Sequence, residues 1–516
     1  MSAAATVGAG ASFVWSDAAV RAALGLGPQS APQAGEPTFT RVHTDTRSLQ
    51  PGDLFVALVG EHFDAHGFVA EALEAGAGAA VVSRDVAGVP ADRLYRVPDT
   101  LVALGDLARW RRRHLPATVV AIAGSAGKTS TKELTRAALS SQLRTHATAA
   151  NLNNRIGVPL TLLSAPVDAQ AVVVEMGTSI RGEMALLTRI VEPDIAVLVT
   201  VGAEHLDGIG SLDDAVDEEL DVLRELSDAA VAIVGDEPAL LAERAVALVP
   251  QVTQPASAGA RLRVAGLTPR ADADLRPSAL EIDEAGHVTL TWHSAHARLS
   301  TPGTHAASNA MLALAVAEAC GVSPQAAVQA VADVTPGKLR GEVRHVAGLQ
   351  LVLDCYNANP QSVSAALELL ARRRSDLRKV VVLGSMLELG AQSDALHDDM
   401  LELALSQGFA HVVATGAFAA AARRLSDRAA ADRGMVTGVS TATGASIATG
   451  ELIMADESIE AFEQLLPHLQ GDEMVLLKGS RGVALERLVP HFEAAFGTSD
   501  DRSGSLLAPN GGGERL

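Results

Sequence analysis

Residues 119–132 constrain the fold more than any other part of this 516-residue chain. They read VVAIAGSAGKTSTK: an apolar run, a turn of small residues, Gly-Lys-Thr and a helix-compatible sequence. A buried strand that passes through a glycine-rich turn into a helix surrounds a phosphate with backbone N–H groups and the positive end of the helix dipole. The segment therefore predicts a phosphate-binding loop, made of Gly124, Ser125, Ala126, Gly127, Lys128, Thr129 and Ser130.

Two side chains of this loop point to ATP and Mg²⁺. A lysine at the place of Lys128 reaches the outer phosphates, and a hydroxyl at the place of Thr129 binds magnesium. The loop departs from the common pattern, because Ile122 stands where that pattern has glycine. A plain strand-to-helix turn with an exposed lysine is the alternative, but the ordered succession of strand, turn, Lys-Thr and helix favours a phosphate loop.

Charge and composition exclude several classes of protein. The formal net charge of −20, with no basic stripe to offset it, argues against a nucleic-acid partner. No apolar run reaches the ~18 residues of a membrane helix. The N-terminus lacks the basic and apolar regions of a signal peptide, and two cysteines make a disulfide framework unexpected. We expect a cytoplasmic monomer that does not bind a membrane.

Breaks in the hydrophobic pattern divide the chain into three domains and a tail. Pro116 ends one helical pattern, and Pro336-Gly337 forms a second break. The predicted fold class is α/β. It has an N-terminal domain at 1–115, a central ATP-binding domain with a parallel sheet at 116–336, a Rossmann-like C-terminal domain at 337–497 and a disordered tail at 498–516.

Alternation of buried strands with helical patterns predicts the parallel sheets of the second and third domains. The central strands are expected at 119–123, 171–174, 195–199 and 229–234, with an antiparallel addition at 288–292. The C-terminal strands are expected at 349–353, 380–383, 412–414 and 474–477.

Two side chains that follow buried strands are candidate metal ligands. Glu175 comes directly after one apolar run, and His205 follows another. A carboxylate at the carboxyl end of a strand beside a phosphate loop is well placed to hold Mg²⁺. A salt-bridged glutamate and a hydrogen-bonded structural histidine are the alternatives.

Short motifs between residues 44 and 486 resemble those of the Mur ligase family. They are DTR at 45–47, GDLFVAL at 52–58, the phosphate loop, NLNNRIGVP at 151–159, EMG at 175–177, GAEHL at 202–206, GTH at 303–305 with NA at 309–310, DCYNANP at 354–360, LGSMLELG at 383–390 and KGSRG at 478–482. The YNANP, MLELG and KGSR segments together resemble the branch of the family that adds D-Ala-D-Ala to UDP-MurNAc-tripeptide.

The resemblance implies an ATP-dependent amide ligase that works through an acyl phosphate. The N-terminal domain would hold the UDP end of UDP-MurNAc-tripeptide, and the C-terminal domain would bring D-Ala-D-Ala. Besides the loop, the implied ATP contacts are His305, Asn309, Arg340 and Asp354. The implied substrate contacts are Thr46, Arg47, Asn153, Asn154, Asn357, Asn359, Lys478, Ser480 and Arg481. The implied magnesium ligands are Thr129 for one ion, with Glu175 and His205 for the other; Lys128, Glu175, His205 and Glu219 are the expected catalytic residues.

Glu219 marks the main departure from the family. The family usually places a carbamylated lysine fourteen residues after the magnesium-binding histidine, and this chain has Glu219 there. A carboxylate carries the same charge as a carbamate but is shorter, so we predict that Glu219 takes over its role and makes the enzyme independent of carbon dioxide. A solvated acidic helix face is the alternative, because Asp213, Asp214 and Asp217 are also acidic.

Three other functions stay open at this point. A sibling ligase that adds the third amino acid is one, although the DNPR motif typical of it is not found. A folylpolyglutamate synthetase-like ligase is another. A non-catalytic nucleotide-binding relative is the third, against which the intact Lys128, Thr129, Glu175 and His205 argue.

Overall fold

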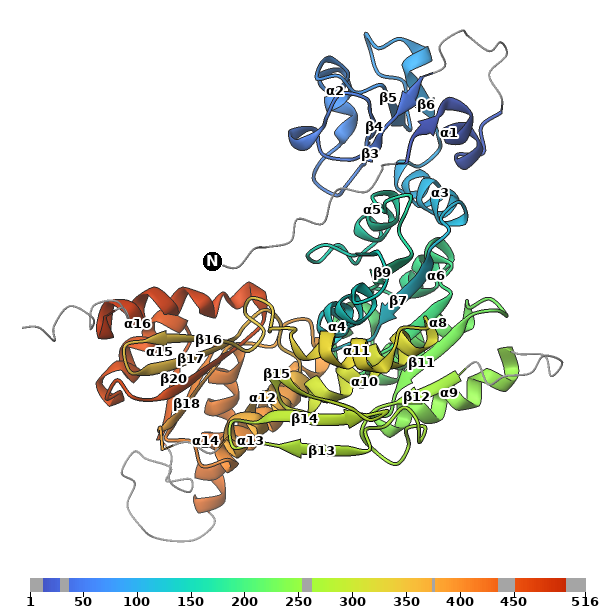
Figure 1. Cartoon of the computed structure of the whole chain (residues 1–516). Helices are drawn as coiled ribbons and strands as arrows, with labels where there is room; N and C mark the ends of the chain where they lie inside the picture. The colour runs from blue at the N-terminus through green and yellow to red at the C-terminus, as the bar shows by residue number, and fades with distance from the viewer. Residues whose placement is uncertain (1–12, 28–36, 253–261, 374–375, 435–450, 498–516) are drawn as a thin grey trace, which may run out of the picture.

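The computed structural model describes residues 13–27, 37–252, 262–373, 376–434 and 451–497. Three α/β units follow one another along the chain, coloured blue, cyan to yellow, and orange to red in Figure 1. This is the α/β class that the sequence predicted. The tail predicted at 498–516 lies outside the described residues.

The N-terminal unit is built on a four-stranded parallel sheet in the order β3-β4-β5-β6, beside a short antiparallel pair β1-β2. Its elements are β1 (Trp15–Ser16), α1 (Asp17–Ala23), β2 (Thr38–Phe39), β3 (Arg41–His43), η1 (Thr46–Ser48), β4 (Asp53–Val56), η2 (Ala65–Phe68), α2 (Val69–Glu74), β5 (Ala79–Val82), η3 (Ala91–Arg93), β6 (Leu94–Arg96) and α3 (Thr100–Arg113).

Helix α3 anchors this unit to the central one. Its last turn is basic: Arg109 and Arg113 both pair with Glu192, at 2.8 and 2.6 Å. Arg111 is buried and donates a hydrogen bond of 2.9 Å to the Ala165 carbonyl. The arginine cluster therefore fastens one unit to the next, and one hydrophobic core runs through α3 into both.

The central unit has a six-stranded parallel sheet in the order β12-β11-β10-β7-β9-β8, with a three-stranded antiparallel sheet β13-β14-β15 beside it. The strands are β7 (Thr118–Ala123), β8 (Thr145–Ala147), β9 (Ala171–Glu175), β10 (Ile195–Leu198), β11 (Val231–Gly235), β12 (Leu262–Ala265), β13 (Ala279–Ile282), β14 (His287–Trp292) and β15 (Ala295–Pro302). The helices are α4 (Lys128–Ser140), α5 (Gly157–Leu163), α6 (Glu183–Val191), α7 (Leu206–Ile209), α8 (Leu212–Arg224), α9 (Ala239–Val252), α10 (Thr304–Ala319) and α11 (Pro324–Ala332). The predicted central strands and the antiparallel addition are present, with ends that differ by up to two residues.

The C-terminal unit has a six-stranded sheet in the order β16-β17-β21-β18-β19-β20, parallel apart from the β16-β17 pair. Its strands are β16 (Glu342–Val346), β17 (Leu349–Asp354), β18 (Lys379–Leu383), β19 (His411–Thr415), β20 (Glu451–Ala455) and β21 (Met474–Lys478). Its helices are α12 (Pro360–Arg372), η4 (Gly390–Gln392), α13 (Ser393–Ser406), α14 (Ala417–Gly434), α15 (Ser458–Leu465), η5 (Leu466–His468), η6 (Arg481–Val483), η7 (Leu485–Leu488) and α16 (Val489–Phe496). Strands β16 and β20 and helices α14 and α16 were not predicted from the sequence.

None of the helices in the described ranges is long and apolar enough to span a bilayer.

Candidate active site

The phosphate loop runs from the end of β7 to the start of α4 and needs both of its glycines. Gly124 and Gly127 have φ angles of 128° and 77°, in the region that favours glycine. A Cβ at Gly124 would lie 2.8 Å from the Thr200 carbonyl oxygen, and one at Gly127 would lie 2.9 Å from Asn309 Oδ1. The two glycines of the GxxGKT sequence therefore stand at two positions where the backbone of the loop approaches its neighbours closely.

Ser125 ties the loop to the segment that follows β10. Its backbone N–H donates to the Thr200 carbonyl (2.8 Å), and its Oγ accepts from the Gly202 N–H (3.0 Å). This places the loop beside Glu204 and His205, which follow Gly202 by two and three residues.

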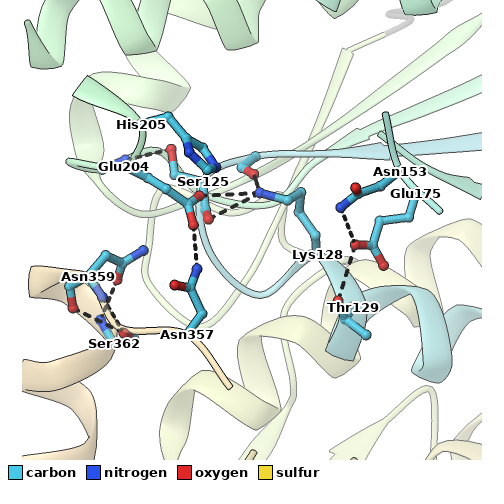
Figure 2. Close-up of polar contacts among 12 residues, drawn as sticks. Ser125, Lys128, Thr129, Asn153, Glu175, Glu204, His205, Asn357, Asn359 and Ser362 are labelled. Carbon is cyan, nitrogen blue, oxygen red and sulfur yellow. Dashed lines mark hydrogen bonds and ion pairs between the residues drawn. The ribbon is translucent and has the colours of Figure 1, made fainter. Parts of the chain in front are cut away.

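Lys128 lies among carbonyl and carboxylate oxygens. Its Nζ donates to the carbonyls of Gly124 (2.5 Å) and Ser125 (3.2 Å), and lies 3.3 Å from Glu204 Oε2 (Figure 2). Burial alone would lower the pKa of Lys128, but the carboxylates of Glu204, Glu219 and Glu175 raise it. The lysine therefore stays cationic at the mouth of the loop.

Thr129 and Glu175 meet on the other side of Lys128 (Figure 2). Thr129 Oγ1 donates to Glu175 Oε1 at 3.2 Å, and Asn153 Nδ2 donates to the same oxygen at 3.0 Å. Glu175 is buried; its Oε2 lies 3.8 Å from the buried ammonium of Lys132 but accepts no hydrogen bond from the described residues. A buried carboxylate oxygen that accepts no hydrogen bond is unfavourable. A hard cation beside Thr129 would satisfy it.

Glu219, on α8, offers a second such oxygen. Its side chain is buried, and within the ranges that the structure describes its Oε2 accepts no hydrogen bond. Burial raises the pKa of Glu219 to about 7, with the charges of Glu204 and Glu218 acting in the same direction against the attraction of Lys128. The alternative of a solvated acidic helix face does not hold for Glu219, because this side chain is buried and faces the phosphate loop rather than water. Glu175 and Glu219 thus each place near one loop a buried carboxylate oxygen that accepts no hydrogen bond from the described residues, and such a pair fits a bound Mg²⁺.

His205 does not lie next to Glu175. Its Nδ1 contacts the carboxylate of Glu388, which belongs to the C-terminal unit. Figure 2 shows His205 and Glu175 on opposite sides of Lys128. The structure therefore brings together Thr129 and Glu175 of the predicted magnesium ligands and leaves His205 apart from them.

Residues of the C-terminal unit contact the phosphate loop directly. Arg340 Nη2 donates to Thr129 Oγ1 at 3.1 Å, and its guanidinium lies 4.1 Å from the ring centroid of Tyr356. Lys478 is buried, with its Nζ 3.1 Å from Asp354 Oδ2 and 2.7 Å from the Asn357 carbonyl oxygen. The implied nucleotide contacts of both units thus face one another.

Several predicted substrate residues have structural partners. Asn154 Oδ1 accepts from two backbone N–H groups at the start of α5, and Asn359 caps α12. Ser480 is buried and braces the 383–390 loop by accepting from the Leu387 N–H at 3.0 Å. Arg481 pairs with Glu486 at 2.6 Å.

Two further groups of predicted residues lie on η1 and at the start of α10, where Asn309 packs against Gly127 of the phosphate loop. Thr46 and Arg47 lie on η1 of the N-terminal unit, where Arg47 is exposed and pairs with Asp45 at 2.6 Å. His305 is exposed in the first turn of α10, and Asn309 is buried one turn later. Their ligand-binding roles stay predictions.

Three residues at the meeting point of the central and C-terminal units had no predicted role: Glu204, Glu388 and Gln361. Their roles depend on contacts between units, for which the sequence gives no local signal. Cys355 is buried, and burial raises the pKa of its thiol to about 12, which suits packing rather than chemistry.

A second cluster of metal-ligand type lies in the C-terminal unit: His411, Glu451 and His468. Arg378 Nη2 donates to Nε2 of His411 at 2.9 Å, which leaves the proton of a neutral ring on Nδ1. A metal on the inward-facing Nδ1 would need the lone pair that this proton occupies. Because His411 is then neutral, the cluster is better described as polar contacts around Glu451, which lies 3.7 Å from His411 Nδ1 and 3.1 Å from His468 Nδ1.

Comparison with known families agrees with this arrangement. The family description "Mur ligase middle domain" matches residues 122–317, and "Mur ligase, glutamate ligase domain" matches residues 339–481. The chain belongs to the Mur ligase family. Both matched regions contain residues that meet at the phosphate loop, so the candidate site lies where the two units meet.

Individual Mur ligases match most of the chain. It is 37% identical over 392 residues to the UDP-N-acetylmuramoyl-tripeptide--D-alanyl-D-alanine ligase of Escherichia coli, covering 74% of this chain and 83% of that one. A MurF crystal structure from Acinetobacter baumannii matches with a TM-score of 0.78 and 29% identity, over 94% of this chain and 100% of that one. A MurF structure from Thermotoga maritima in complex with ADP gives a TM-score of 0.71 and 25% identity, over 90% and 98%.

Proposed function

We propose that this Mur ligase joins D-alanyl-D-alanine to UDP-N-acetylmuramoyl-tripeptide with hydrolysis of ATP to ADP and phosphate. The observation that carries the proposal is the meeting of the phosphate loop with the C-terminal unit, where Arg340 contacts Thr129 and Asn357 contacts Glu204. The substrates are those of the D-alanyl-D-alanine ligases to which most of the chain is similar.

A carboxylate is a poor electrophile, so the terminal carboxylate of the tripeptide is activated by attack on the γ-phosphorus of ATP. ADP leaves in this first step. The amine of the dipeptide then attacks the acyl carbon of the acyl phosphate, so the amide bond forms and inorganic phosphate is released. Lys128 offsets the charge of the transferring group, and Arg340 adds a second cation from the C-terminal unit. The protein itself forms no covalent bond; it aligns the reactants and excludes water.

Thr129 Oγ1, Glu175 and Glu219 are the residues that we propose to hold Mg²⁺. Bound there, Mg²⁺ would neutralise phosphate charge during transfer. Thr129 and Glu175 already face one another, and Glu219 contributes a carboxylate where the family makes one by carbamylation. His205, paired with Glu388, would join them only after a change in the contact between the units.

The test is phosphate release by the purified full-length protein in the presence of ATP and Mg²⁺. We expect release only when UDP-MurNAc-tripeptide and D-Ala-D-Ala are both present, in a one-to-one ratio with an amide product seen by mass spectrometry. Lys128→Ala should lower the rate by about 10³-fold or more, since a lost charge on a transferring phosphoryl group costs several kcal/mol.

A panel of acceptors distinguishes the alternatives. Turnover with a single amino acid in place of the dipeptide would identify a sibling ligase. Turnover of a folate with glutamate would identify a folylpolyglutamate synthetase. Absence of turnover with every acceptor, although ATP binds, would identify a non-catalytic relative.

A further inference from the structure

We propose that Glu204 is a positioning residue that links the C-terminal unit to Lys128 of the phosphate loop. Its two carboxylate oxygens have different partners: Oε2 lies 3.3 Å from Lys128 Nζ, and Oε1 accepts a hydrogen bond of 2.7 Å from Asn357 Nδ2 (Figure 2). The inference rests on the proposed function, because it assigns a role in that same reaction.

The buried carboxylate of Glu204 is stabilised by both partners, Lys128 and Asn357. Only 9% of the residue is exposed, and a buried carboxylate is tolerated where it is paired and hydrogen-bonded. Lys128 belongs to the central unit, whereas Asn357 belongs to the loop that follows β17 in the C-terminal unit. The carboxylate is therefore fully satisfied only while the two units are docked.

The contacts of Asn357 fix which way its amide points. Its Oδ1 accepts from the Ala358 N–H at 2.9 Å, so the Nδ2 group is the one that faces Glu204. Its carbonyl oxygen accepts from the buried ammonium of Lys478 at 2.7 Å, and Lys478 in turn pairs with Asp354. The donor that reaches Glu204 is thus rigidly mounted on the C-terminal sheet.

The C-terminal unit holds the same stretch of the central unit at two further points. Gln361 Nε2 donates to the Val201 carbonyl at 2.7 Å, and Glu388 contacts His205. A Cβ at Gly202 would lie 2.3 Å from Gln361 Oε1, so Gln361 packs directly against the backbone at Gly202. Of the three contacts, the one through Glu204 reaches Lys128, whereas the peptide that Gln361 holds reaches the loop at Ser125, through the Gly202 N–H.

The arrangement makes the loop lysine sensitive to domain docking. When the C-terminal unit is docked, Asn357 holds Glu204, and Glu204 holds the ammonium of Lys128 at the mouth of the loop. When that unit leaves, Glu204 loses a charge-assisted hydrogen bond and its side chain is free to turn. The docked arrangement therefore favours phosphoryl transfer, and the unit expected to bring the amine controls the step that activates the acid.

A charge-rearrangement experiment tests this link in the full-length protein. Asn357→Asp places two carboxylates face to face, and we expect kcat for ligation to fall about 10- to 100-fold, the effect of losing a hydrogen bond to a charged group. Adding Glu204→Gln restores a donor–acceptor pair with the roles reversed. The double variant should return to within about 3-fold of Glu204→Gln alone, with little change in KM for D-Ala-D-Ala.

Gln361→Leu is the matched control, because it removes a hydrogen bond across the same interface without touching Glu204 or Lys128. We expect it to keep kcat within about 3-fold of wild type, as a single neutral hydrogen bond contributes about 1 kcal/mol. Asn357→Ala, with thermal midpoints for every variant, separates loss of the link from loss of folding.

Two results would overturn the proposal. If Asn357 acts only by binding substrate, the losses from Asn357→Asp and Glu204→Gln will multiply instead of being rescued, and KM for the dipeptide will rise. If Gln361→Leu lowers kcat as much as Asn357→Asp, docking in general is responsible. A wild-type protein that forms no amide would instead refute the proposed function itself.

Discussion

Glu219 is buried against the phosphate loop, and its Oε2 accepts no hydrogen bond from the described residues. Its role can therefore be tested by changing this one residue. Glu219→Gln keeps the shape and removes the charge. We expect kcat/KM to fall about 10- to 100-fold and the Mg²⁺ concentration for half-maximal rate to rise, because a cation loses an anionic partner. Mn²⁺ binding followed by electron paramagnetic resonance should weaken in parallel, which reports on the ion independently of turnover.

Asp217→Asn is the control for this experiment, since Asp217 lies two residues away on α8 and its side chain is half exposed. It should leave both readouts close to wild type. Unchanged Mg²⁺ dependence in Glu219→Gln would show that the carboxylate does not hold the ion. Glu219→Lys offers a complementary measurement: if the carbamate interpretation is right, activity in that variant should depend on added bicarbonate.

At the residue scale, local patterns predicted the phosphate loop but not its neighbours. Gly124 and Gly127 could be read from the sequence, because their φ angles and close contacts are built into a short turn. The pairing of Glu204 with Asn357 joins residues 153 positions apart in two different units. Such a pair depends on how the units dock, which no local periodicity encodes.

At the scale of elements, Glu218 on α8 holds the start of α6. Its carboxylate accepts from the N–H groups of Gly182 (2.7 Å) and Met184 (2.8 Å) and from the Thr178 hydroxyl (3.0 Å). The two N–H groups have no acceptor within α6 itself, because they lie at its N-terminus, where the helix dipole also favours a negative charge. Glu218 therefore caps the N-terminus of α6 from a neighbouring helix.

Glu218→Ala should lower the stability of this region by about 3 kcal/mol, because buried donors lose a charged acceptor. In Glu218→Ala, hydrogen exchange measured by mass spectrometry should be faster over α6 than in wild type. Asp217→Asn, a neighbouring change on α8, should leave the exchange of α6 unchanged. Equal protection of α6 in wild type and Glu218→Ala would contradict the capping role.

The two C-terminal strands that were not predicted share a physical reason. Strands β16 and β20 lie at the two edges of the C-terminal sheet, where a strand has one neighbour and shows a weaker buried pattern. Strands inside the sheets, such as β7 and β18, are buried along nearly their whole length, so their apolar runs were plain in the sequence.

At the scale of the whole molecule, the parallel sheets of the central and C-terminal units place their chemistry between them. The phosphate loop follows β7, and the 354–360 and 383–390 segments follow β17 and β18. Ligands of α/β sheets bind outside the carboxyl ends of the strands. A site divided in this way is complete only when the units are docked, so whatever shapes the 383–390 loop also shapes the site.

His397 shapes that loop and makes it sensitive to pH. The residue is buried; its Nε2 accepts from the Met386 N–H at 3.0 Å, and its Nδ1–H donates to the Ser393 carbonyl at 2.7 Å. Burial lowers the pKa of His397, Arg424 acts in the same direction, and the Ser393 hydrogen bond with Asp394 and Asp398 opposes them. The folded protein thus holds the neutral ring, and a proton would remove the acceptor for Met386.

The sign of the pH effect follows from this difference. Below the ordinary histidine pKa of about 6.5, the unfolded chain binds a proton at this histidine and the folded chain does not. The free energy of unfolding therefore decreases as the pH is lowered, by up to about 1.4 kcal/mol per pH unit. The thermal midpoint should therefore be lower at pH 5.5 than at pH 7.5. His397→Gln keeps an acceptor for the Met386 N–H but does not titrate, so its midpoint should change less between the two pH values, even if it is lower at both. An equal change in the two proteins would mean that other groups carry the acid sensitivity, and that the 383–390 loop keeps its shape when the pH falls.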